Sequence, residues 1–137
     1  LQPMSHEKLK ALIPKTIMGA KRTGFDASIS NGAGNATAEY ELNDSTTLSL
    51  SFYDCGGPAG AGIYELQYGG MINAESNDAG EYTKTINYGD DKAFEHCEKA
   101  TNDCTITWMA GGRYLVTLAG ENIGAEALKK AGKELRF

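Results

Sequence analysis

The sequence predicts a single α+β domain over residues 1–137, in which an antiparallel sheet of about six to seven strands is covered on one face by two or three helices. Three observations carry this prediction. A chain of 137 residues has the length of one domain and can bury a core without disulfide staples. Its 17 glycines against 3 prolines indicate many turns and few long helices. Several short segments alternate apolar and polar residues, whereas helical spacing occurs near both ends and once in the middle.

The N-terminal part of the chain opens with a helix and continues with three strands. Apolar side chains recur at helical spacing from His6 to Ile13, and Pro14 ends this predicted helix. Turn residues from Asn43 to Ser45 join the second and third strands into a hairpin. The strands, predicted from the period of two that a half-buried strand shows, are residues 25–30, 36–42 and 47–52.

The rest of the chain contains one short helix, four strands and a terminal helix. Residues 54–62 form a glycine-rich loop, residues 63–71 have helical spacing, and residues 73–80 form a polar loop. Gly111-Gly112 suits a tight hairpin turn, because both residues can take positive φ. The last predicted element is a helix from about Gly124 to Leu135 with one apolar stripe. The four strands are residues 81–88, 92–98, 104–110 and 113–119.

The strand over residues 104–110 predicts how the sheet faces its helices. Ile106 and Trp108 alternate with Thr105 and Thr107. We therefore expect the first pair to face the helices and the threonines to face water. Short turns between consecutive strands predict antiparallel pairing.

The charge balance excludes several classes of function. The chain carries 13 Lys plus Arg against 18 Asp plus Glu, a net charge of −5, and this argues against nucleic-acid binding, which needs a basic face. The cations gather only near the C-terminus, where we expect a solvated helix face. No apolar run approaches the length of a transmembrane segment. The cations in question are Lys129, Lys130, Lys133 and Arg136.

No motif in the sequence assembles a catalytic, cofactor-binding or metal site. The glycine-rich loop has neither a dinucleotide-binding nor a P-loop pattern, and the acidic loop at residues 73–78 does not continue as a calcium loop would. Carboxylates cluster near His96, but strand alternation places Glu95 and His96 on opposite faces, so we interpret residues 90–96 as a charged edge strand. We therefore predict no catalytic residues, no cofactor and no metal.

The three cysteines indicate a disulfide. Cys97 and Cys104 bracket a turn and can face each other across two antiparallel strands, so we predict that they are joined and that Cys55 is free. A zinc site formed by the three cysteines with His96 is the alternative, but the spacing is unlike that of a zinc ribbon. A disulfide and a first residue other than Met favour an exported chain, in the periplasm or at the cell surface, whose signal segment lies outside the printed sequence.

The pattern of the chain resembles small exported bacterial domains of unknown function, many of them lipoproteins. The resemblance rests on the opening helix that ends in Leu12-Ile13-Pro14, on the basic join at Lys21-Arg22, and on the closing Arg113-Tyr114 hairpin and helix. It implies an α+β layout similar to that of PsbP-like accessory proteins. We therefore expect an exported, non-enzymatic binding or accessory domain for an unknown protein or small-molecule partner. The alternative is a hydrolase-like enzyme with an unrecognised site.

Overall fold

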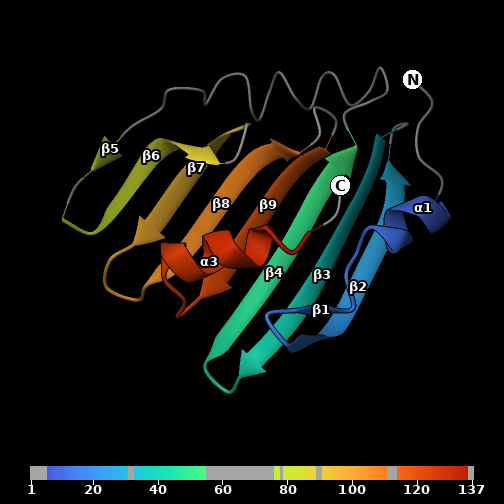
Figure 1. Ribbon diagram of the computed structural model, residues 1–137, viewed down its shortest axis with the longest axis horizontal. Coiled ribbons are helices and arrows are strands. Elements are labelled where there is room, and N and C mark those ends of the chain that lie inside the picture. Colours follow the sequence, from blue (N-terminus) through green and yellow to red (C-terminus); the bar gives the residue numbers. More distant parts are fainter. Residues whose placement is uncertain are drawn as a thin grey trace.

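The fold is an antiparallel sheet with short helices on one side (Figure 1). The structure is a computed structural model that describes residues 6–30, 33–54, 76–77, 79–88, 91–110 and 114–135. In chain order the described elements are α1 (His6–Ala11), β1 (Thr16–Ile17), β2 (Ala20–Ser30), β3 (Ala33–Asn43), β4 (Thr46–Asp54), β5 (Ser76–Asn77), β6 (Glu81–Tyr88), β7 (Asp91–Glu98), β8 (Asp103–Ala110), β9 (Tyr114–Glu121) and α3 (Ala125–Gly132).

The chain builds the sheet from both edges towards its centre. The described strands lie in the order β1-β2-β3-β4-β9-β8-β7-β6-β5, and each neighbouring pair is antiparallel. Strands β1 to β4 therefore run inward from one edge, and β5 to β9 run inward from the other. The two halves meet where β4 pairs with β9, and there Leu50 lies opposite Leu118.

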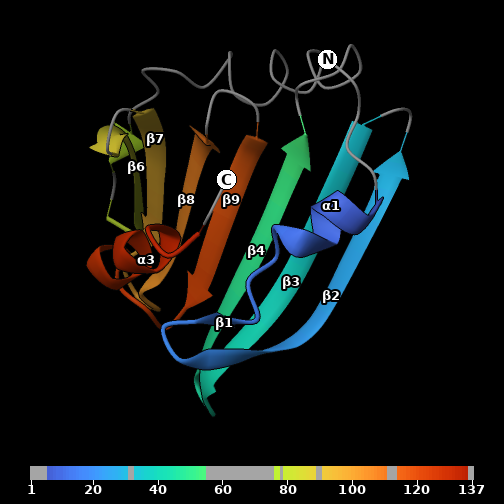
Figure 2. The same ribbon diagram turned by 45° about the vertical axis from the view of Figure 1, so that its right-hand side comes forward.

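Strand alternation gives the sheet two faces of different chemistry. We call the side covered by α1 and α3 the inner face and the opposite side the outer face (Figures 1 and 2). Leu50, Leu118 and Ile106 form one cross-strand row of the inner face, and all three are fully buried. In β4 the burial alternates at every residue. The hydrophobic core therefore lies between the sheet and its helices, as expected for a sheet covered on one side.

Helix α1 is fixed to the sheet by packing and by hydrogen bonds just beyond its end. Leu9 is fully buried and packs over Gly34, where a Cβ atom would lie 3.0 Å from the Leu9 side chain. The Tyr40 hydroxyl donates to the carbonyl of Pro14, and the Arg22 guanidinium donates to the carbonyl of Ile13. The polar groups that follow the helix are thus satisfied by β2 and β3.

Helix α3 packs closely against the sheet at its last residue, Gly132. Leu128 and Ala131 are fully buried against the inner face. Gly132 lies over Tyr88 and Trp108, whose rings meet edge to face with centroids 5.1 Å apart. The Tyr88 hydroxyl donates to the backbone carbonyl of residue 129 within the helix. A side chain larger than hydrogen at residue 132 would push α3 away from these two rings.

The predicted α+β fold class was wrong. The sheet has nine described strands, and the two described helices contain only 6 and 8 residues, so they cover a small part of it. The seven predicted strands are present, but the two-residue strands β1 and β5 are too short to produce a periodic pattern. The polar join before residue 25 belongs to β2, whose register shifts at a bulge between Arg22 and Gly24. The predicted helix at residues 63–71 lies outside the described residues.

The predicted orientation of the strand over residues 104–110 is confirmed. Ile106 is fully buried and Trp108 is 5% exposed beneath α3, while Thr105 and Thr107 lie on the outer face. Among the described residues, no helix has the length or the apolar character needed to cross a membrane. The Gly111-Gly112 turn lies outside the described residues.

We predict that Gly132→Ala destabilises the protein by about 1–2 kcal/mol. Alanine favours a helix over glycine by roughly 1 kcal/mol, but its Cβ would collide with the Tyr88 hydroxyl and lie 3.1 Å from the Trp108 ring. Gly124→Ala is the matched control, because a Cβ there lies no closer than 3.5 Å to Asn102. Urea unfolding of both variants measures the difference. Equal stability of the two variants would contradict the close approach of α3.

Candidate functional site

The polar residues of β7 are divided between the two faces of the sheet. Glu95 is buried on the inner face and His96 lies on the outer face, as strand alternation predicts. The interpretation of residues 90–96 as an edge strand was wrong, because β7 pairs with β6 on one side and with β8 on the other. Two separate polar clusters result, and each has its own chemistry.

The inner polar cluster consists of Tyr82, Lys84, Glu95 and Lys129, and it joins α3 to β6 and β7. Glu95 is 1% exposed. Its Oε2 accepts a hydrogen bond of 2.6 Å from the Tyr82 hydroxyl and lies 3.5 Å from the Lys84 ammonium. Its Oε1 lies 2.7 Å from the Lys129 ammonium, in an ion pair rather than a well-aligned hydrogen bond. A buried carboxylate thus has two cations and one hydroxyl around it.

These contacts keep Glu95 and Lys129 ionised. Burial by itself would raise the pKa of Glu95, but the Lys129 ammonium, the Tyr82 hydroxyl and the Lys84 ammonium outweigh it and hold the pKa below its ordinary value. The contact with Glu95 raises the pKa of Lys129 against the opposing effect of burial. Burial, together with the hydrogen bond to Glu95, raises the pKa of Tyr82 to about 12.

Lys129 differs from the prediction for the basic C-terminal residues. We predicted a solvated helix face, and Lys130 and Lys133 are indeed exposed. The Lys129 side chain is only 24% exposed and faces the sheet, so the prediction was wrong for this residue. Arg136 lies outside the described residues. The sequence could not show that Lys129 pairs with Glu95, because the two residues belong to elements whose packing is not encoded in their spacing.

The inner polar cluster is not prepared for proton transfer at neutral pH. A general acid or base works best when its pKa lies near the working pH. Here the pKa of Glu95 is lowered, that of Lys129 is raised, and that of Tyr82 is about 12, so all three move away from neutrality. The chemistry of this cluster is that of an ion pair that holds α3 on the sheet.

Hydroxyl groups form rows across the centre of the outer face. Ser51, Thr117 and Thr107 lie side by side on β4, β9 and β8, and all three are partly exposed. The hydroxyl oxygens of Thr107 and Thr117 are 3.4 Å apart. Ser49, in the next row, donates to the carboxylate of Glu39 on β3. No described helix covers these rows (Figure 2).

An acidic row lies beside the hydroxyl rows on the outer face. Glu81 is directly opposite Glu98, which is directly opposite Asp103, on β6, β7 and β8. Glu121 continues the row on β9. Cys104 of β8 is paired with Gly120 of β9, so in this antiparallel pair Asp103, just before Cys104, is next to Glu121, just after Gly120. We call these four residues the acidic row. Four neighbouring carboxylates create an excess of negative potential at one end of the outer face. Like charges at directly opposed positions also destabilise a sheet.

The acidic row meets the candidate metal ligands at one corner of the sheet. Among the residues that the structure describes, Glu81, His96 and Glu98 are the group whose ligand atoms lie within 4.8 Å of one another, and we call them the outer corner. The sequence alone does not reveal this group, because Glu81 is remote in the chain and only the β6–β7 register brings it to the others. The one available signal was the i, i+2 spacing of His96 and Glu98, which places both side chains on the same face.

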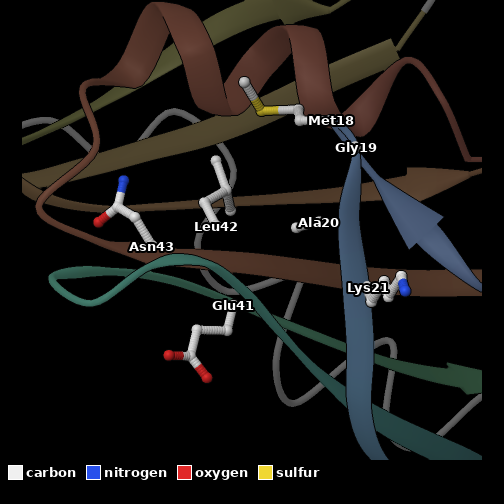
Figure 3. A pocket seen from close by; sticks show the side chains of 7 residues that line it. All are labelled: Met18, Gly19, Ala20, Lys21, Glu41, Leu42 and Asn43. Atoms are coloured by element: carbon white, nitrogen blue, oxygen red, sulfur yellow. The ribbon is translucent and has the colours of Figure 1, made fainter.

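A cavity between the β1–β2 and β3–β4 turns has a volume of about 460 Å³. Figure 3 shows its lining, with Glu41 pointing away from the Lys21 side chain. Ligand pockets usually combine an apolar lining with a few convergent polar groups. Because its two charged residues do not converge, we do not place the functional site in this cavity. The full lining is Met18, Gly19, Ala20, Lys21, Glu41, Leu42 and Asn43.

The two predicted disulfide partners face each other across β7 and β8. Cys97 is paired with Cys104 in the sheet, their Cα atoms are 4.1 Å apart, and the sulfur atoms lie at disulfide distance, 2.20 Å. Along β7, Cys97 lies between His96 and Glu98 of the outer corner, and the cysteine pair is on the inner side of the sheet. Cys55 lies outside the described residues.

We predict that Glu95 makes the stability of the protein fall in acid. The folded state holds the Glu95 pKa below 4.5, its ordinary value, so the unfolded chain binds that proton more readily. The stabilisation is complete above about pH 4.5 and is lost as the pH falls through the lowered value of the folded state. Between about pH 6 and about pH 3, the unfolding free energy of the unmodified protein should fall more steeply than that of Glu95→Gln. Glu7→Gln, which changes an exposed carboxylate, serves as control. If the unfolding free energies of the unmodified protein and of Glu95→Gln fall in parallel as the pH is lowered, the lowered pKa of Glu95 is contradicted.

Comparison of the chain with protein-family models, with curated proteins and with solved structures finds no match, so its function has to be inferred from its own geometry.

Proposed function

We propose that the chain is an exported, non-enzymatic binding module that uses the outer face of its sheet to bind a basic protein or peptide. The observation that carries the proposal is the acidic row, which lies beside partly exposed hydroxyl groups on the face that no described helix covers. A partner rich in Lys and Arg provides the complementary charge. Rows of hydroxyl groups beside it can donate and accept hydrogen bonds with backbone or side chains.

Charge complementarity favours a basic partner over an acidic or purely apolar one. Glu98 and Glu121 are exposed, and the protein as a whole has a net charge of −5. A smaller apolar cluster of Phe94, Met109 and Leu115 lies on the same face, but all three side chains are buried. They therefore offer little apolar surface to a partner, and recognition would depend mainly on charge and hydrogen bonding.

The ionisation of the inner polar cluster supports a binding role over the alternative of a hydrolase-like enzyme. This cluster contains the buried carboxylate of Glu95, and the pKa values of Glu95, Tyr82 and Lys129 are shifted away from neutrality. Hydrolysis by acid–base chemistry would need at least one group that exchanges protons near the working pH. The pH dependence of stability in Glu95→Gln tests whether Glu95 is held ionised in the folded state.

The cysteine pair supports export. Sulfur atoms at disulfide distance in Cys97 and Cys104 fit an oxidising compartment, because cytosolic thiols are kept reduced. By the loop-closure model, a disulfide across so short a loop contributes about 2–3 kcal/mol. It would hold together the ends of β7 and β8, next to the acidic row.

The proposed function predicts selective weakening of basic-peptide binding by changes in the acidic row. An oligolysine peptide is titrated into the protein at about 0.05 M salt, where surface charges are only partly screened. The double variant Glu98→Gln/Glu121→Gln should bind at least about fivefold more weakly than the unmodified chain.

The matched control removes two charges from the helix side of the protein. Glu7 and Glu126 are both exposed there, so Glu7→Gln/Glu126→Gln lowers the net negative charge by the same amount. Binding by this control should stay within about twofold of the unmodified protein. Equal weakening in the two double variants would reduce the effect to net charge and would overturn the outer face as the binding surface.

A further inference from the structure

The outer corner combines one imidazole and two carboxylates on two paired strands. His96 and Glu98 are two residues apart on β7 and share the outer face, and Glu81 is directly opposite Glu98 on β6. The ligand atoms of the three residues lie within 4.8 Å of one another, and the His96 Nε2 atom is 3.6 Å from Glu81 Oε2. Both neighbouring strands are hydrogen-bonded to β7, so the Cα positions of the group are fixed by the sheet.

Thr83 orients the imidazole towards the carboxylates. It is the direct cross-strand neighbour of His96, and its hydroxyl oxygen lies 2.8 Å from His96 Nδ1. When Nδ1 donates its proton to this hydroxyl, the lone pair of Nε2 is free on the side of Glu81. Histidines that bind metals commonly have their second ring nitrogen held in this way by a neighbouring polar group.

The corner is also electrostatically suited to a cation. Glu81 and Glu98 are like charges at directly opposed positions, and Asp103 stands opposite Glu98 on the other side. Such pairs repel one another in a sheet. A divalent ion between the first two carboxylates would replace this repulsion by attraction.

We propose that Glu81, His96 and Glu98 form a binding site for Zn²⁺ on the outer face. Zn²⁺ accepts imidazole nitrogen and carboxylate oxygen together, whereas Ca²⁺ and Mg²⁺ prefer oxygen ligands alone. With bonds of about 2.0–2.2 Å, ligands around a tetrahedral ion lie roughly 3.3–3.5 Å apart. The side chains of Glu81 and His96 are 52% and 38% exposed, so small rotations can close the remaining distance. Three protein ligands leave the fourth position to water or to a group of a bound partner.

The site goes beyond the proposed binding of a basic partner and does not depend on it. The full chain is titrated with zinc chloride by isothermal calorimetry, with the Cys97–Cys104 pair oxidised and Cys55 alkylated so that no thiolate can bind the ion. We expect one Zn²⁺ per chain and weaker binding of Ca²⁺. His96→Ala and Glu98→Gln should each weaken Zn²⁺ binding at least about tenfold. Circular dichroism and thermal unfolding show whether each variant is folded, and Glu98→Gln, which keeps the shape of the side chain, remains informative if His96→Ala does not fold.

Two further variants separate ligands from surrounding charge. Glu39→Gln changes another outer-face carboxylate, on β3, and should leave zinc affinity within about twofold. Thr83→Val should weaken binding by about tenfold, and Thr83→Ser should restore it, because only the hydroxyl is needed to hold Nδ1. Absence of zinc binding by the unmodified chain, equal affinity for Ca²⁺, or unchanged affinity in His96→Ala would each overturn the site. If the unmodified chain binds zinc but does not bind oligolysine, the proposed binding of a basic partner is contradicted and the zinc site is not.

Discussion

The buried carboxylate of Glu95 is the constraint that fixes how helix α3 fits on the sheet. A charge that is 1% exposed is tolerated only when cations and hydrogen-bond donors surround it. Tyr82 and Lys84 come from the neighbouring strand, but the closest cation, Lys129, comes from α3. The helix must therefore lie close enough to β7 for Lys129 to reach the carboxylate and keep it ionised. Gly132 then allows the next turn of α3 to reach the Trp108 ring.

The two faces of the sheet have different roles in this arrangement. Apolar rows such as Leu50, Leu118 and Ile106 provide the core on the inner face. The intervening residues place hydroxyl and carboxylate groups on the outer face, beside the smaller buried apolar cluster of Phe94, Met109 and Leu115. Strand alternation places Glu95 in the core and His96 at the outer corner, although the two are adjacent in sequence. One strand thus supplies both the anchor for the helix and a candidate ligand.

The sequence predicted the local structure well and the contacts between elements poorly. Alternation located seven strands and oriented Ile106 and Trp108 correctly, because a period of two is a property of the strand itself. The fold class was wrong because short helices and two-residue edge strands leave little periodic signal. The acidic row and the outer corner were missed for a different reason: they exist only through cross-strand register, which no spacing within one strand encodes. The pairing of Lys129 with Glu95 likewise depends on packing across the core.

A double-mutant cycle on Glu95 and Lys129 measures whether this ion pair holds α3 on the sheet. Urea unfolding at neutral pH would compare Glu95→Gln, Lys129→Met and the double variant, with Lys130→Met as a control on the exposed side of α3. If the carboxylate holds the helix through this ammonium, Lys129→Met leaves the buried Glu95 charge with fewer partners. The substitution should therefore destabilise the unmodified protein more than it destabilises Glu95→Gln. We expect a coupling free energy of at least about 1.5 kcal/mol. If the two substitutions change the unfolding free energy additively within about 0.5 kcal/mol, the ion pair does not hold α3 on the sheet.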